Sequence, residues 1–274
     1  MSCFRYTPIK MAHKVFETLR GKSNDKCPVI FMHGLMESKE TWRRVPERVA
    51  NKTKRKVYAF DARNHGESEH TMVSNFDNNL YDLYHFMDTM KIEKSILVGH
   101  SMGGMTAIKA ALDQPSRVEM VFSVNMHTDK IHPEIINRWL FHLLRLADGY
   151  CTFEINKPNM AFVTEPPSNE KMRKNEKLYN SVHVFRCLAL SDALLEFDAA
   201  QPTTHLNGKY PGPAYFIFGP RNILCGKRLY TLSHIKHFPE AEVIPMTDYS
   251  NDLFRDKKLA NALCETILHV QKFI

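Results

Sequence analysis

Apolar residues along this chain gather in two kinds of segment. Short runs rich in Val, Ile, Phe and Tyr predict strands that are buried on both faces. Between these runs, apolar residues recur at helical spacing. The predicted strands are 28–34, 56–63, 94–100, 118–125, 213–219 and 241–246. The predicted helices are 40–50, 76–90, 105–114, 228–238 and 255–274.

This alternation of strand and helix indicates right-handed crossovers, and so an α/β protein with a doubly wound, mostly parallel sheet. The alternating residues 6–16 predict a further strand. Residues 130–205 break the rhythm, because amphipathic and turn-rich segments follow one another there without a strand. We therefore expect a core formed by residues 1–129 and 206–274, with residues 130–205 inserted as a helical cap at the carboxyl edge of the sheet.

Length and composition narrow the class of protein. The chain has 274 residues and 43% apolar content, enough for a substantial core. Its apolar runs are far shorter than the ~20 residues that a membrane-spanning helix needs. The six cysteines are scattered without a C-x-x-C pair, which argues against a disulfide framework and a zinc site. We expect no transmembrane segment, no metal and a reducing compartment.

The charge adds little to this picture. A formal net charge of +7 favours anionic partners, but Lys and Arg are spread along the chain without interleaved aromatics. We interpret them as an ordinary solvated surface, so nucleic acid is not a predicted partner, and lipid headgroups are a lesser alternative. No secretory signal is visible in the first ten residues, "MSCFRYTPIK", which favours the cytosol.

The segment "GHSMGG" (99–104) carries the clearest chemistry. It contains a G-x-S-x-G motif between a predicted strand and a predicted helix, the context that a serine nucleophile requires. Ser101 is the predicted nucleophile. The backbone N–H groups of Leu35 and Met102 are the predicted oxyanion donors, because Leu35 follows the strand that ends at "HG" and Met102 follows the serine. The alternative is a chance match in a buried loop.

Three motifs in this order and spacing, "HGLMES" (33–38), "DARNHGES" (61–68) and "GHSMGG", resemble the α/β-hydrolase superfamily. The likeness is to its abhydrolase-domain-eleven branch and related short bacterial esterases. It runs through residues 28–125 and more weakly through 211–274. The resemblance implies a capped serine hydrolase for ester or thioester bonds of acyl or lipid-like molecules, without a cofactor. It also implies that Asp61, Arg63 and His65 are scaffold, and His33 is interpreted as a residue that fixes its loop.

The partners that would activate Ser101 are missing from their expected places. A serine needs a histidine to take its proton and an acid to orient that histidine. The two acid positions carry Asn125 and the segment 220–222, Pro-Arg-Asn, and the histidine position carries Tyr249. His237 and His269 lie elsewhere in the pattern. The substitutes that remain open are His127, Asp129, Asp192 and Asp248.

Two interpretations follow. The first is a catalytically impaired or non-catalytic hydrolase-fold protein, a pseudoenzyme, whose cap and core enclose a pocket for a small apolar or acyl ligand. The amphipathic cap helix around Trp139 would line that pocket. The second is an active serine carboxylesterase or thioesterase with an unrecognised base. A cytoplasmic location is expected, with the mitochondrion as the alternative because the resembled branch includes mitochondrial members. No protein partner is predicted.

Overall fold

The computed structural model of this chain describes residues 6–18, 26–34, 37–71, 76–125, 206–218, 237–246 and 257–270. Within these residues, seven strands form one sheet in the order β1-β3-β2-β4-β5-β6-β7. Its strands are β1 His13–Phe16, β2 Val29–Met32, β3 Val57–Phe60, β4 Ser95–His100, β5 Val118–Val124, β6 Ala214–Phe218 and β7 Ala241–Pro245. The predicted cap, residues 130–205, and most of the predicted helix 228–238 lie outside the described residues.

The sheet is mostly parallel, as predicted. Only β1 runs antiparallel, against β3, among the strand pairs of the described residues. The strand order reverses between β2 and β4, since the chain passes from β2 to β3 on one side and from β4 to β7 on the other. In doubly wound sheets, ligands bind beyond the carboxyl ends of the strands at such a reversal. The fold therefore directs attention to the ends of β2 and β4.

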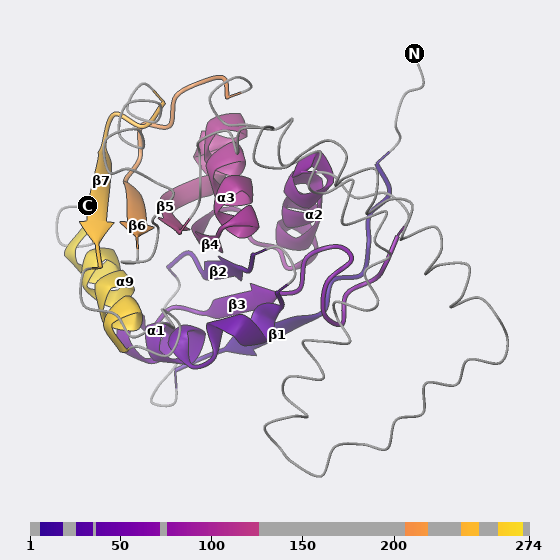
Figure 1. Ribbon diagram of the computed structural model, residues 1–274, viewed down its shortest axis with the longest axis horizontal. Coiled ribbons are helices and arrows are strands. Elements are labelled where there is room, and N and C mark those ends of the chain that lie inside the picture. The colour runs from indigo at the N-terminus through magenta and orange to yellow at the C-terminus, as the bar shows by residue number, and fades with distance from the viewer. Residues whose placement is uncertain are drawn as a thin grey trace, which may run out of the picture.

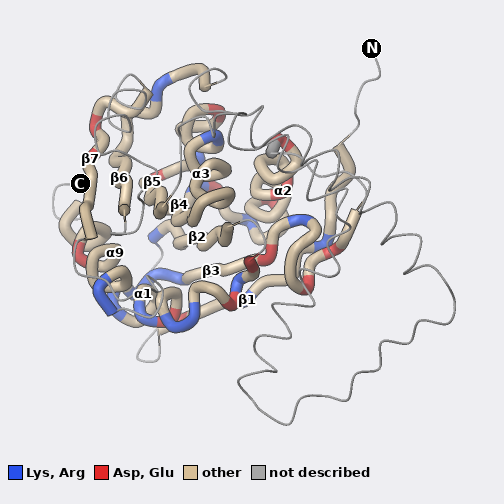
Figure 2. The backbone as a smooth tube through the Cα atoms, viewed as in Figure 1, with Lys and Arg blue, Asp and Glu red and all other residues tan. Residues whose placement is uncertain are grey.

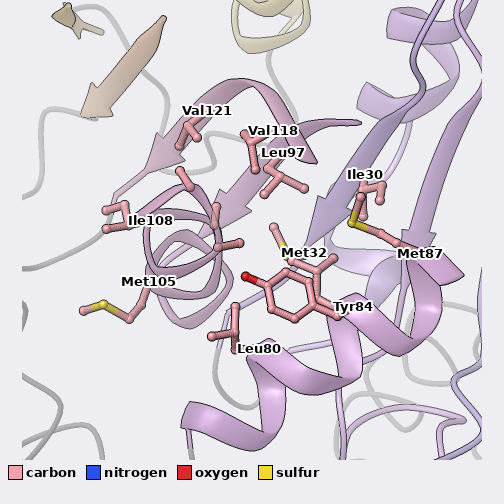
Figure 3. Close-up of a cluster of buried hydrophobic side chains, with 14 of the residues drawn as sticks. Ile30, Met32, Leu80, Tyr84, Met87, Leu97, Met105, Ile108, Val118 and Val121 are labelled. Carbon is pink, nitrogen blue, oxygen red and sulfur yellow. The ribbon is translucent and has the colours of Figure 1, made fainter. Parts of the chain in front are cut away.

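Helices cover both faces of the sheet (Figure 1). The helices α1 (Val45–Thr53) and α9 (Lys257–Val270) pack on one face, and α2 (Phe76–Thr89) and α3 (Met102–Asp113) cover the other. Side chains alternate along a strand, so neighbouring residues of β2 enter different cores. Ile30 packs with the α2–α3 layer, part of which Figure 3 shows, and Phe31 packs with the α1–α9 layer. Both side chains are fully buried.

Two predictions need correction. The predicted helix 40–50 is two elements, a 3₁₀ helix at Lys39–Trp42 and α1, separated by Arg43 with φ 50°. Pro46 explains the break, because a proline restricts the residue before it and starts a helix well at its first turn. Strand β7 is not buried on both faces, since Val243 is 47% exposed. In the described part of the chain, no helix has the length and apolar character to cross a membrane.

Candidate active site

The turn between β4 and α3 holds Ser101 in an uncommon backbone conformation. Its φ is 48° and its ψ is −110°. Such strain costs on the order of 1–3 kcal/mol and persists only where the surroundings enforce it. Here the Ser101 N–H donates to the Val124 carbonyl at 3.0 Å, and the Ser101 carbonyl accepts from Met105 at 3.0 Å. The serine is thus fixed at the sharp strand-to-helix turn that the motif predicts, and it is partly exposed.

The glycines of the motif are required by close backbone packing. A Cβ on Gly99 would lie 2.1 Å from the Gly103 carbonyl oxygen. A Cβ on Gly103 would lie 2.3 Å from the Met32 carbonyl oxygen. Real Cβ contacts of this length do not occur, so larger residues would force the turn away from β2. The glycines of the G-x-S-x-G pattern are therefore required by the geometry of this turn.

The start of α3 presents an amide to the site. Met102 is the first residue of α3, so its N–H has no acceptor within the helix. No acceptor among the described residues takes this N–H, whereas the next one, Gly103 N–H, donates to the His33 carbonyl at 3.1 Å. A helix start whose amide lacks an acceptor, as here among the described residues, is typical of places where an anionic oxygen binds. Leu35, the second predicted donor, lies outside the described residues.

A carboxylate that sequence reasoning missed joins the loop after β2 to the turn. The Gly34 N–H donates to Oε2 of Glu37 at 2.8 Å, and the same oxygen lies 2.9 Å from Nδ1 of His100. Burial raises the pKa of Glu37, but the bonds with His100 and Gly34 outweigh it and hold this pKa below its ordinary value. Glu37 thus links Gly34 to the residue before Ser101. Sequence spacing gave no signal for this pairing.

His33 has the loop-fixing contacts that its position predicts. Its Nε2 accepts from the Ala62 N–H at 2.9 Å, so its Nδ1 carries the proton and donates to the Gly34 carbonyl at 2.7 Å. Burial is the main cause that lowers the pKa of His33. Both ring nitrogens are occupied by backbone groups. This histidine is therefore neutral and does not serve as a base for Ser101.

The loop after β3 is scaffold, as the resemblance implies. The fully buried carboxylate of Asp61 accepts from the Lys39 ammonium at 2.5 Å and from the Glu67 N–H at 2.9 Å. Gly66, with φ 53°, packs closely against this carboxylate, and a Cβ there would lie 2.3 Å from the carboxyl carbon of Asp61. With the Lys39 N–H, which donates to Oδ1 at 2.7 Å, these contacts pair both carboxylate oxygens and hold the loop against Lys39.

Two further residues of this loop are also structural. Arg63 makes a two-pronged ion pair with Asp82 of α2, at 2.9 and 2.7 Å. His65 is buried, its Nδ1 lies 2.7 Å from the Arg63 carbonyl, and burial lowers its pKa to about 3. A pKa this low makes His65 a weak base, and the contacts described for these groups do not include Ser101.

The first predicted acid position carries an amide. Asn125 directly follows β5, with φ 47°, and its N–H donates to the Ile217 carbonyl at 2.9 Å. Within the described ranges, no side chain hydrogen-bonds the Ser101 hydroxyl. His237 precedes β7, as predicted, and does not follow it as the expected histidine would. Its Nδ1 lies 2.8 Å from the Gly208 carbonyl. The other candidate partners lie outside the described residues: His127, Asp129, Asp192, the segment 220–222, Asp248 and Tyr249.

A small cavity lies beside the start of α3. Its volume is about 10 Å³, and Met32, Phe60, Met102 and Thr106 are among its lining residues. This volume accommodates about one water molecule. The apolar ligand site that the sequence predicts would be lined by the cap, which lies outside the described residues. In the described ranges, no cluster of three or more His, Cys, Asp or Glu side chains could hold a metal ion.

Comparison with known proteins identifies the family. Residues 28–177 match the α/β hydrolase fold family, and the chain belongs to it. The fold agrees with solved structures such as a thermophilic esterase from Thermogutta terrifontis, with a TM-score of 0.67 at 17% identity, covering 96% of this chain and 94% of that chain.

The curated relatives include sn-1-specific diacylglycerol lipase ABHD11 of Danio rerio, 39% identical over 120 residues, which are 44% of this chain and 37% of that protein. Ethanol acetyltransferase 1 of Hanseniaspora uvarum is 32% identical over 130 residues, 47% of this chain and 37% of that protein. The matched part thus spans well under half the length of these relatives. The resemblance to the abhydrolase-domain-eleven branch is confirmed.

Proposed function

We propose that this protein binds an acyl or lipid-like ester over Ser101 and hydrolyses it poorly or not at all. The observation that carries the proposal is a contrast within one site. The turn that presents Ser101 is fully built, with its strained φ of 48° and its glycine contacts. The acid position beside it carries Asn125, and the chain has Tyr249 where the histidine is expected.

The chemistry of binding uses backbone groups. The ester carbonyl oxygen would accept hydrogen bonds from the N–H groups of Met102 and Leu35, with the Ser101 hydroxyl against the carbonyl carbon. The Gly34 N–H donates to the Glu37 carboxylate at 2.8 Å, which holds the residue directly before Leu35. Apolar residues of segment 130–205 would cover the acyl chain. No cofactor or metal has a part in this proposal.

The missing proton acceptor sets the expected rate. Removing the serine or histidine of a well-studied triad lowers kcat about 10⁶-fold, while oxyanion donors and binding alone retain roughly 10³–10⁴ over water. An aspartate-to-asparagine exchange alone costs roughly 10⁴. This chain would keep only the rate enhancement that oxyanion donors and binding supply. The names of two relatives, a diacylglycerol lipase and an ethanol acetyltransferase, support acyl esters as the ligand class.

Binding and turnover should therefore separate. We expect a fluorescent long-chain acyl ester to bind the purified protein, and nitrophenyl acetate to be cleaved at a rate that Ser101→Ala leaves nearly unchanged. Turnover that is fast in the wild type and lost in Ser101→Ala would overturn the proposal.

A second candidate is an active serine carboxylesterase or thioesterase with a substitute base. The retained strain at Ser101 favours it, because strain of this kind persists at working active sites. His127, two residues after Asn125, is the first base to test. Rapid turnover in the wild type that His127→Ala abolishes, with folding intact, would establish this candidate.

A further inference from the structure

Positive charge gathers on the outer surface of one helix layer. Figure 2 shows Lys and Arg concentrated where α1 meets the beginning of α9. We define the basic face by six residues: Arg43, Arg44, Arg48, Lys52, Lys257 and Lys258. Five of them are exposed, and Arg48 is partly exposed. The charge is thus available to a partner in solution.

The basic face is continuous across both helices. Arg44, Arg48 and Lys52 are spaced four residues apart, so they line one stripe along α1. The Lys52 ammonium donates to Oδ1 of Asn261 on α9 at 2.8 Å, so the stripe on α1 lies against α9. Asn261 is about one turn after Lys257 and Lys258, the first residues of α9. The six cations therefore belong to one surface.

The opposite helix layer is built differently. There, Lys109 pairs with Asp77 at 2.9 Å, and Arg117, after α3, pairs with Asp88 at 2.7 Å. On the basic face, Arg44 lies 3.7 Å from Glu47, a loose contact in which the Arg44 side chain is 78% exposed. Arg44 is thus held more loosely by its acidic neighbour than Lys109 and Arg117 are by theirs.

Helix stability does not account for the four cations at the helix starts, Arg43, Arg44, Lys257 and Lys258. A helix N-terminus carries partial positive charge, so acidic residues stabilise it and basic residues oppose it. The first turn of α9 contains Lys257 and Lys258 and no acid. Arg43 and Arg44 also stand directly before a helix, α1, whose first turn contains one acid, Glu47. Residues that break a local rule without helping the fold mark a functional surface.

The basic face lies toward the edge of the sheet that carries Ser101. Helix α1 follows β2 and α9 follows β7 along the chain, so both helices begin on the side of the strands' carboxyl ends. Ser101 directly follows the carboxyl end of β4, which pairs in parallel with β2. The cations at the two helix starts are therefore on the side where a ligand would approach.

We propose that the basic face docks the protein on an anionic lipid bilayer, so that the Ser101 edge faces the membrane. This inference rests on the proposed function, which makes the ligand an acyl ester that concentrates in membranes. Clusters of four to eight Lys or Arg match the negative surface potential of such bilayers. Nucleic acid fits less well, because single strands need exposed aromatic rings and Trp42, the aromatic residue next to Arg43, is fully buried.

Vesicle binding tests the proposal without any need for catalysis. The full chain is sedimented with vesicles of phosphatidylcholine that contain 30% or no phosphatidylserine. We expect binding to the anionic vesicles only, weakening as salt rises. Each cation near the surface contributes about fivefold to binding. The variant Arg44→Gln/Arg48→Gln/Lys257→Gln should therefore bind about 100-fold more weakly.

A matched control separates a local surface from overall charge. Lys91→Gln/Lys94→Gln/Lys209→Gln removes three exposed cations that precede β4 and β6, at the other edge of the sheet. This control should bind like the wild type. Equal losses in both variants, equal binding to neutral vesicles, or tighter binding to a polyuridine strand than to vesicles would each overturn the proposal. Acyl-ester binding in solution is measured separately, so docking and the proposed function fail independently.

Discussion

The carboxyl ends of β4 and β5 lie side by side and share one backbone arrangement, yet they differ in chemistry. His100 and Val124 are register partners, and the residues that follow them, Ser101 and Asn125, have φ values of 48° and 47°. At the end of β4, the strained turn and the close glycine contacts that present a serine are in place. At the end of β5, an amide stands where an acid is expected. Packing therefore maintains the backbone at these two strand ends, whether or not the groups that would move protons are present.

The largest expected effect comes from supplying the missing groups. Asn125→Asp combined with Tyr249→His should raise the turnover of nitrophenyl acetate by about 10⁴-fold or more, because the triad acid alone accounts for roughly that factor. Initial rates of purified variants measure it. Tyr249→Phe with Asn125→Asp is the control, since it supplies an acid without an imidazole. No gain in the correctly folded double variant would show that the two positions are not those of a lost triad.

The packing side of the comparison is tested at Gly103. In Gly103→Ala, the new methyl group would lie 2.3 Å from the Met32 carbonyl oxygen, so the turn must move or β2 must shift. We expect a loss of about 3 kcal/mol or more in the free energy of unfolding, comparable to severe overpacking. Urea denaturation measures it. Ala110→Gly, within α3, should cost only about 1 kcal/mol, and an equal cost at both positions would contradict the packing argument.

The buried His65, in the loop after β3, should make the stability of the protein fall at acid pH. Burial holds the pKa of His65 at about 3, below the 6.5 of an exposed histidine. Below pH 6.5 the unfolded chain binds a proton that the folded chain does not, so stability falls as the pH falls. Between pH 7 and 4.5 this amounts to about 2–3 kcal/mol. His65→Gln should lose that part of the pH dependence in urea titrations. His70→Gln, exposed on the same loop, should retain it, and identical slopes in all three proteins would refute this assignment.

A smaller expected effect is a difference between the ends of β4 and β5 in how much a glycine stabilises the protein. Glycine adopts positive φ without strain, and asparagine tolerates it better than serine. We therefore expect Ser101→Gly to raise the free energy of unfolding by about 1–2 kcal/mol. Asn125→Gly should change it by less than about 0.5 kcal/mol. Thermal unfolding of both variants measures the difference. A larger gain at residue 125 would reverse the order of strain that φ and residue type imply.

Much of the fold could be predicted because buried strands carry a strong apolar signal. All six predicted strands that follow residue 28 are present, and α3 ends at Asp113, just before Pro115. The break at Arg43 was missed, because the helical spacing continues through it and only Pro46 marks the new start. The exposure of β7 was missed because apolar content does not distinguish an edge strand from a central one.

The site was predictable where local backbone geometry dictates residue type. The glycines and Ser101 follow from the turn itself, so the motif alone indicated them. The contact of Glu37 with His100 joins residues 63 positions apart, and no periodicity reports such a pairing. The partners expected for Ser101 depend on loops outside the described residues, so their absence remains a prediction from Asn125 and Tyr249.

The central claim is that Ser101 stands in a complete turn without a proton acceptor. The most direct measurement is the second-order rate constant for labelling of the wild-type protein by a fluorophosphonate probe, followed by mass spectrometry of the peptide that contains Ser101. We expect the wild-type protein to be labelled no faster than Ser101→Ala, in which any signal comes from other residues. Rapid labelling of Ser101 itself, complete within minutes and absent from Ser101→Ala, would contradict it.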